Sequence, residues 1–303
     1  MLEAINDEKF RGVLERIAVA LERIVEILEV EEVAKSRFGS STTKIREEKR
    51  DGINTSQVDE FLLDFLNQRG VEVRGFQPVV YRDPKFDKLA MFMGDRFENL
   101  KDFLKFLRRY SQNGEEFTVS LRDYPPEAIS DICQLCHNMK SLGYLKDYRY
   151  SKSPKRHLSV KTIRDSSVQN FLDGKWLQRY ILKTLDRAKN RVTQTLGIKL
   201  DIASITNLKV VIDDMETELY HLFRVNNETF LIEAKLGEHH EEDIEKFKRI
   251  SEALQLGDNV ILILAELNSR KHRSNVYGMP AVRLSYLEQH LANEFTKFAA
   301  KLL

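Results

Sequence analysis

Apolar residues recur along residues 10–35 at alternating intervals of four and three, the spacing of a helix with one continuous apolar stripe. The stripe consists of Phe10, Leu14, Ile17, Leu21, Ile24 and Leu28. Charged residues flank it, so the pattern predicts an amphipathic helix that either packs on its own domain or pairs with a second copy as a short coiled coil. We expect residues 1–70 to form a helical segment and the protein to be a homodimer. The pattern stops over residues 36–57, which indicates a linker before a second helix at 56–68.

Short strands and helices alternate along residues 71–166. The expected elements are a strand at 79–81, a helix at 99–110, a strand at 117–121, a helix at 127–142, and two strands at 144–150 and 158–163. Pro125 and Pro126 suit the first turn of the helix at 127–142. A helix followed by a β-hairpin is typical of a winged-helix module, so we expect a winged-helix-like nucleic-acid-binding domain here.

The third region, residues 167–303, begins with a helix and continues with a run of strands. The expected order is a helix at 174–190, strands at 192–196, 208–212, 218–225 and 229–235, a helix at 241–254, strands at 259–267 and 282–284, and a helix at 287–302. Residues 268–275 are expected to be a loop. This order predicts an α/β domain with a mixed sheet flanked by helices.

Composition narrows the class of protein. The 303 residues are 42% hydrophobic and 31% charged, which excludes disorder of the whole chain. The net charge of +1 excludes a globally basic nucleic-acid binder, so any basic surface must be local. Residues 1–11 lack a signal-peptide core and no apolar run is long enough to span a membrane. With only two cysteines, Cys133 and Cys136, we expect a cytoplasmic protein without disulfides.

The strongest chemical signal is Glu233-Ala234-Lys235, at the end of the predicted strand 229–235. Side chains alternate with a period of two along a strand, so a carboxylate and an ammonium share one face. Metal-dependent nucleases use such a pair, the carboxylate to hold a divalent cation and the lysine to steady the attacking water or the phosphate.

A second carboxylate follows from the expected hairpin register. If Asn226 and Asn227 form a two-residue turn, paired residue numbers sum to 453, Tyr220 faces Glu233 and Glu218 faces Lys235. Glu218 and Glu233 would then bind Mg²⁺ or Mn²⁺. A slip of one residue would turn Glu218 to the other face, and the alternative ligands would be Asp213, Asp214 and Glu216.

Two motifs together resemble a known family. The helix motif runs from Gly174 through Trp176-Leu177-Gln178 to Tyr180, and the strand motif is Leu231-Ile232-Glu233-Ala234-Lys235. At this spacing, residues 172–267 resemble a PD-(D/E)xK nuclease domain, a restriction-endonuclease-like fold. The resemblance is closest to the nuclease half of the CRISPR-associated, cyclic-oligoadenylate-activated nucleases. Their preceding sensing domain has no counterpart pattern in residues 1–165.

The resemblance implies a metal-dependent endonuclease that hydrolyses DNA, in defence or mobile-element biology. Glu218, Glu233 and Lys235 would be catalytic, and Gln178 would orient a metal-bound water. The family has acids where this chain has Gln178 and Tyr220. The alternative is therefore a non-catalytic DNA-binding or assembly protein on a degenerate nuclease fold.

A local excess of positive charge occurs in the predicted hairpin of the middle region. It comprises Lys146, Arg149, Lys152, Lys155, Arg156 and Lys161. Phosphate contacts dominate nucleic-acid affinity, so these residues are candidate contacts to nucleic acid, with DNA expected rather than RNA. An ordinary charged loop is the alternative interpretation.

Overall fold

The computed structural model describes residues 59–76, 84–153, 156–237, 240–265, 273–276 and 278–301. The described residues all belong to one compact unit of the chain, Ile53–Leu303. The predicted helix at 10–35, the linker at 36–57, the strand at 79–81 and Lys155 lie outside the described residues. No helix among those that are described is long and apolar enough to cross a membrane.

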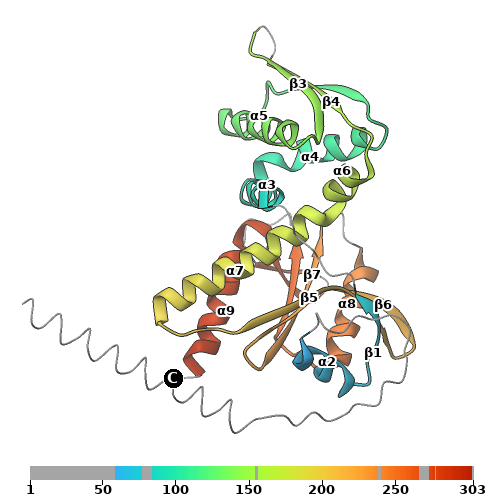
Figure 1. Ribbon diagram of the computed structural model, residues 1–303, viewed down its shortest axis with the longest axis vertical. Helices are drawn as coiled ribbons and strands as arrows, with labels where there is room; N and C mark the ends of the chain where they lie inside the picture. Colours follow the sequence, from blue (N-terminus) through green and yellow to red (C-terminus); the bar gives the residue numbers. More distant parts are fainter. Residues whose placement is uncertain are drawn as a thin grey trace, which may run out of the picture. The chain divides into compact units, whose positions relative to one another are not determined.

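A mixed sheet forms the centre of the C-terminal region (Figure 1). Among the described residues it has seven strands in the order β1-β5-β6-β7-β8-β10-β9. The strands are β1 (Glu72–Phe76), β5 (Ile202–Ile212), β6 (Met215–Val225), β7 (Glu228–Lys235), β8 (Val260–Leu264), β9 (Arg273–Val276) and β10 (Met279–Arg283). The strands β7, β8 and β10 run parallel to one another, whereas the other neighbours are antiparallel. The expected α/β class with a mixed sheet flanked by helices is confirmed.

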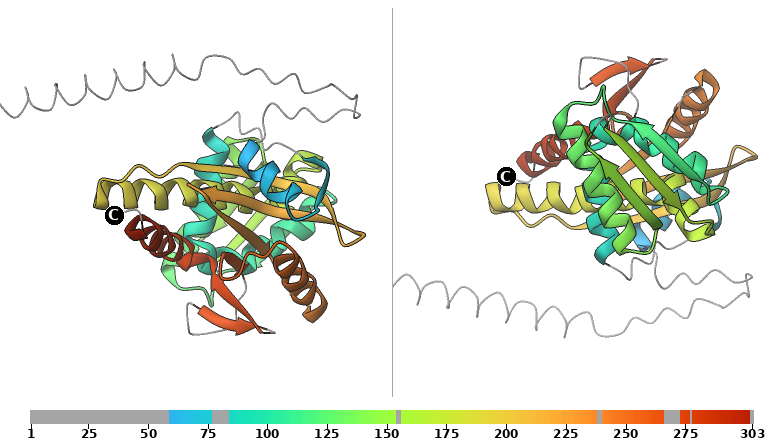
Figure 2. Two further views of the ribbon diagram at one scale, coloured as in Figure 1. Left: turned by 90° about the horizontal axis from the view of Figure 1, so that it is seen from below. Right: turned by 90° about the horizontal axis from the view of Figure 1, so that it is seen from above.

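Helices cover both faces of this sheet (Figures 1 and 2). On one face, α7 (Trp176–Leu196) and α9 (Leu287–Lys301) pack against Phe223, Phe230 and Ile232. On the other, α2 (Glu60–Asn67) and α8 (Glu241–Ala253) pack against Leu222 and Leu231. Consecutive residues of β6 and β7 are buried because the sheet has a core on each side.

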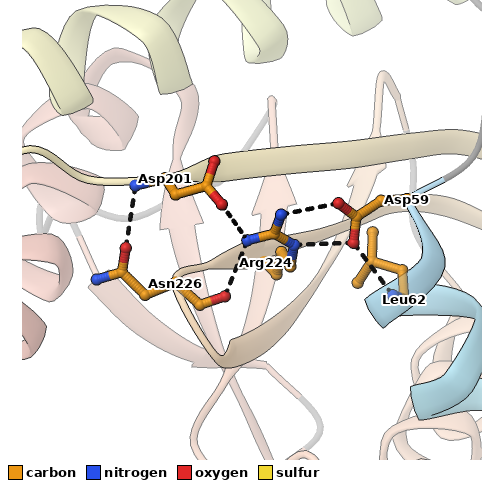
Figure 3. A network of polar contacts seen from close by, with 5 residues as sticks. All are labelled: Asp59, Leu62, Asp201, Arg224 and Asn226. Atoms are coloured by element: carbon orange, nitrogen blue, oxygen red, sulfur yellow. Dashed lines mark hydrogen bonds and ion pairs between the residues drawn. The ribbon is translucent and has the colours of Figure 1, made fainter. Parts of the chain in front are cut away.

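Arg224 fixes α2 to the sheet (Figure 3). Its Nε and Nη2 donate to the two carboxylate oxygens of Asp59, each at 2.8 Å, and Nη1 donates to Asp201 at 2.7 Å. Asp59 is also the N-cap of α2 and accepts from the amide of Leu62 at 3.2 Å. Bidentate pairing with a guanidinium lowers the pKa of Asp59.

A second sheet lies in the middle region. It is antiparallel, has the order β2-β4-β3, and consists of β2 (Glu116–Ser120), β3 (Leu145–Ser151) and β4 (His157–Thr162). Its inner face packs on α4 (Phe97–Ser111) and α5 (Pro126–Ser141), and α3 (Pro84–Asp95) packs against these two helices. The tyrosines Tyr148 and Tyr150 lie on this inner face, each opposite a buried residue of β4, so they do not accompany the exposed basic side chains.

The middle region is attached to the C-terminal region through α7. The chain passes from β4 through α6 (Ser166–Asn170) and the π-helical turn η2 (Phe171–Lys175) into α7, while the short 3₁₀ turn η3 (Leu284–Tyr286) precedes α9. Arg179 of α7 donates to Asp87 of α3 at 2.5 Å, and Lys183 lies 3.2 Å from the same carboxylate. Gly94 of α3 lies directly against the ring of Tyr180. α3 and α7 thus share a close contact.

Several elements differ from the sequence-based expectation. The predicted strand at 192–196 is the last part of α7, because Val192 continues the buried helical stripe of Leu185 and Ala188. The helix α3 was not predicted. Arg273–Val276 forms β9 rather than the end of a loop. Both α2 and β1 pack with the C-terminal sheet, since β1 pairs with β5, and not with the segments to which the sequence assigned them.

Candidate active site

Glu233 and Lys235 stand where the central sheet divides. β6 and β7 pair from Val225–Glu228 to His221–Ile232, which is the register predicted from the Asn226–Asn227 turn. The pairing of β6 with β7 ends at His221–Ile232. β7 continues beside β8, with Glu233 opposite Leu262, whereas β6 continues beside β5. The segment Glu233–Lys235 therefore borders a fork between β6 and β7.

Glu233 is a largely buried carboxylate, with 20% of its side chain exposed. Burial, which disfavours the charged form, raises its pKa to about 7; the positive charges of Lys235 and Lys246 oppose this, and the negative charges of Asp243 and Glu218 add to it. Its Oε1 lies 3.9 Å from Nζ of Lys235. The site thus holds a carboxylate in an environment that favours a neighbouring cation.

Asp243 completes the group, and sequence reasoning missed it. It lies in the first turn of α8, and its Oδ1 is 3.5 Å from Nζ of Lys235. One signal could have found it: three acids, Glu241, Glu242 and Asp243, open the helix that directly follows the Glu-x-Lys strand. The third of them faces the sheet beside Ile244, which is buried in the core on that side.

Glu218 is exposed and lies on the β6 side of the fork. It is opposite Lys209 of β5 and does not pair with Lys235 in β7, which differs from the predicted pairing. Its negative charge nevertheless contributes to the raised pKa of Glu233, so the two carboxylates are electrostatic neighbours. The predicted pairing was wrong from Tyr220 onward, for Tyr220 with Glu233 as well as for Glu218 with Lys235, because the pairing of β6 with β7 ends at His221–Ile232.

Gln178 lies on α7 and contacts a residue of the sheet. Its Nε2 donates to Oδ1 of Asn207, in β5, at 2.6 Å. By the register of β5 and β6, Asn207 is opposite Tyr220. Tyr220 is next to His221, the last residue of β6 that pairs with β7. Gln178 therefore contacts the sheet from the face covered by α7, next to the part of β6 that no longer pairs with β7.

The alternative ligands lie elsewhere. Asp213 and Asp214 form the β5–β6 turn, both with positive φ, and Glu216 faces Val211 just beyond it. A strand rises about 3.3 Å per residue, so the turn is on the order of 20 Å from Tyr220 along β6. The fold does not bring these acids to Glu233.

The carboxylates near Lys235 decide whether this site suits a divalent cation. In the described part of the chain, no group of three or more His, Cys, Asp or Glu side chains could hold a metal. Glu233 and Asp243 flank the Lys235 ammonium, and Glu218 is near enough for its charge to raise the pKa of Glu233. Mg²⁺ is usually held by one or two carboxylates, with water and substrate phosphate completing its shell. The residues present therefore fit a cation that is bound together with substrate.

The predicted nucleic-acid contacts are exposed on β3, β4 and the segment between them. This holds for Lys146, Arg149, Lys152, Arg156 and Lys161. On the outer face, Lys161 lies between Glu116 of β2 and Asp147 of β3. Asp147 in turn accepts from Lys140 at 2.6 Å. The outer face of the sheet is mixed in charge, and the positive excess lies toward the β3–β4 connection.

The solved structures to which this chain is distantly similar include the following two. Protein VC1899 from Vibrio cholerae aligns with 78% of this chain and 60% of its own, at 17% identity and a TM-score of 0.47. Can2 from Sulfobacillus thermosulfidooxidans, solved in complex with cyclic tetra-adenylate, aligns with 77% of this chain and 57% of its own, at 14% identity and a TM-score of 0.44.

The chain thus spans less than two thirds of either structure's length, and similarities at this distance carry no conclusion about function. No protein-family model and no curated protein matches the sequence.

Proposed function

We propose that this protein is a Mg²⁺- or Mn²⁺-dependent endonuclease that hydrolyses phosphodiester bonds in DNA. The observation that carries the proposal is the grouping of Glu233, Lys235 and Asp243 beside the fork between β6 and β7. Carboxylates and a lysine at the open end of a sheet are the side chains that phosphodiester hydrolysis requires.

Each side chain has a distinct role in this proposal. Glu233 would hold the cation, and Asp243 keeps the Lys235 ammonium in place at 3.5 Å. Leu219 belongs to the core under α2 and α8, so Glu218 faces the other side of β6 and would contribute only its negative charge. Lys235 positions the attacking water or stabilises the negative charge that develops on the phosphate. The bound cation would lower the pKa of a coordinated water and bring it closer to the hydroxide form. Gln178 lies further back and acts through Asn207.

We propose that the middle region is a winged-helix-like unit that holds the substrate. Its support is the topology, three helices and a three-stranded antiparallel sheet of order β2-β4-β3, with basic side chains near the β3–β4 connection. Arg149, Lys152 and Arg156 would contact phosphates, which carry no sequence information. Affinity should then fall steeply with salt.

The deciding experiment incubates the full chain with plasmid, single-stranded DNA and RNA, with Mn²⁺, with Mg²⁺ and with EDTA. Cleavage of DNA that needs the metal and is lost in Glu233→Ala and Lys235→Ala supports the proposal. Glu218→Gln should weaken cleavage through the loss of one negative charge near Glu233, whereas Glu216→Gln, two residues away and also exposed on β6, should cleave like the wild type. Metal-independent cleavage, or no cleavage of any substrate, rules the proposal out.

A non-catalytic DNA-binding protein on a degenerate nuclease fold is the second candidate. Gln178 favours it for two reasons. The family that this chain resembles has an acid at this position, and the side chain of Gln178 is hydrogen-bonded to Asn207. This candidate predicts DNA binding without cleavage in both metals. It further predicts that Glu233→Ala leaves the affinity unchanged, which a filter-binding assay would measure. Homodimer formation is a separate proposal, tested by light scattering of the full chain.

A further inference from the structure

Asn207 interrupts β5 near its middle. Its φ is 51°, in the left-handed region that asparagine tolerates better than most residues. The pairing of β5 with β6 runs to Thr206–His221 and resumes at Leu208–Leu219. Asn207 and Tyr220 therefore face each other at a gap in the ladder.

The interruption changes which side of the sheet the following residues face. Ile205 and Leu208, three residues apart on β5, belong to the same buried cluster under α2 and α8. Leu219 and Leu222, three apart on β6, belong to it as well. Residues three apart in a regular strand face opposite sides, so each strand carries one extra residue at this point.

An amide pair holds the interruption in place. Gln178 Nε2 donates to Asn207 Oδ1 at 2.6 Å, and Asn207 Nδ2 donates to Gln178 Oε1 at 3.4 Å. Both side chains are partly buried. Gln178 extends from α7, so a helix on one face of the sheet holds a strand in a conformation that strands do not ordinarily adopt.

The interruption lies at the same level of the sheet as Glu233, the candidate catalytic carboxylate. By the register of β5 and β6, Tyr220 is opposite Asn207, and the pairing of β6 with β7 ends one residue away, at His221–Ile232, next to Glu233. The fork therefore begins at the row that contains Asn207. If β6 continued to pair with β7, Tyr220 would lie beside Glu233 and restrict the approach of a phosphate.

We propose that Asn207, held by Gln178, is a positioning residue that keeps β6 apart from β7 at Glu233 and Lys235. Its role in cleavage rests on the proposed nuclease function, but its effect on the fork does not. The pair acts on the strand that borders the site and does not touch the reacting atoms.

Three single variants separate the amide pair from the backbone conformation. Asn207→Gly keeps access to the left-handed region and loses the amide, and Gln178→Leu loses the partner amide alone. Asn207→Asp keeps both the left-handed tolerance and an acceptor for Gln178 Nε2, so it is the conservative control. We expect the first two to lower kcat by roughly 10- to 100-fold, as loss of an outer positioning partner does, with little change in KM.

The control Asn207→Asp should cleave at nearly the wild-type rate. The double variant of Gln178→Leu with Asn207→Gly should lose no more activity than the less active of the two single variants, because the two residues act as a unit. The melting temperature should stay within about 3 °C of the wild type in each case, as for loss of one short and one long hydrogen bond between partly exposed side chains in a chain of this size.

Hydrogen exchange of the full chain gives a readout without cleavage. Peptides that cover Leu219–Leu222 should exchange faster in Asn207→Gly and Gln178→Leu, but not in Asn207→Asp. Unchanged exchange in the first two variants overturns the inference, and so does wild-type cleavage by both. Faster exchange in a protein whose wild type cleaves nothing would leave the inference standing and remove the proposed nuclease function.

Discussion

Lys235 lies closer to Asp243, on a different element, than to Glu233, its neighbour on the same strand. The distances from its Nζ are 3.5 Å to Asp243 Oδ1 and 3.9 Å to Glu233 Oε1. The ammonium is therefore held between the sheet and α8, and its position depends on both.

This geometry predicts that Asp243→Asn weakens cleavage without abolishing it. Loss of one charge partner leaves Lys235 attached to Glu233 but less well oriented, and such partners typically contribute 10- to 100-fold. Single-turnover cleavage rates would measure the effect. Glu242→Gln, in the same helical turn, is the matched control and should have no effect. A complete loss of activity in Asp243→Asn would indicate that Asp243 is itself a metal ligand.

Glu233→Gln should separate activity from stability. The folded-state pKa of Glu233 is raised to about 7 from an ordinary 4.5, so the folded protein binds the proton more tightly than the unfolded chain does. Its contribution to stability is complete below pH 4.5 and is lost as the pH rises through 7. With metal present, the variant should lose cleavage. Without metal, it should unfold at a higher temperature than the wild type at pH 8. Calorimetry at pH 5 and pH 8 tests this. The same difference in unfolding temperature between variant and wild type at both pH values would contradict it.

His221 should make the protein sensitive to acid. Its side chain is fully buried, neither ring nitrogen has a hydrogen-bond partner in the described part of the chain, and burial lowers its pKa to about 3. A lowered pKa means that the unfolded chain binds the proton first, so stability falls as the pH drops below about 6.5 toward 3.

His221→Phe, beside the edge-on ring of Phe223, should reduce that loss and be at least as stable as the wild type at pH 7. Urea unfolding at pH 5 and pH 7 provides the measurement. A variant with the same pH dependence as the wild type would show that other groups cause it.

Arg224→Met should destabilise the protein by about 2–3 kcal/mol, because it leaves Asp59 and Asp201 without their guanidinium. The pKa of Asp59 is lowered in the folded state, so the stabilisation is present above pH 3.8 and is lost as the pH falls through the folded-state value. Urea unfolding at pH 7 gives the magnitude. Arg74→Met removes an exposed pair with Glu72 and should cost much less.

Gly94→Ala should disturb the contact between α3 and α7. An added Cβ would overlap the buried ring of Tyr180, and the strain is expected to cost about 1–3 kcal/mol. Gly75→Ala is the control, since nothing lies within 4 Å of an added Cβ there. Thermal unfolding would compare the two. Equal melting temperatures would mean that the α3–α7 contact adapts without strain.

The sequence alone determined the elements whose patterns are local. The Asn226–Asn227 turn and the alternation on both sides of it fixed the register of β6 and β7 as far as His221, because a two-residue turn and a period of two leave no other pairing. The same alternation placed Glu233 and Lys235 together on β7. Helices with strong apolar periodicity, such as α4 and α8, were also found within a few residues.

Only the tertiary structure decided how the site is assembled. Asp243 reaches Lys235 because α8 packs back on the sheet, and no local pattern encodes that distance. The left-handed turn of Asn207 depends on an amide 29 residues away, so it broke the alternation on which the pairing of Glu218 with Lys235 was predicted. Long-range packing overrides a local period wherever a distant side chain stabilises the exception.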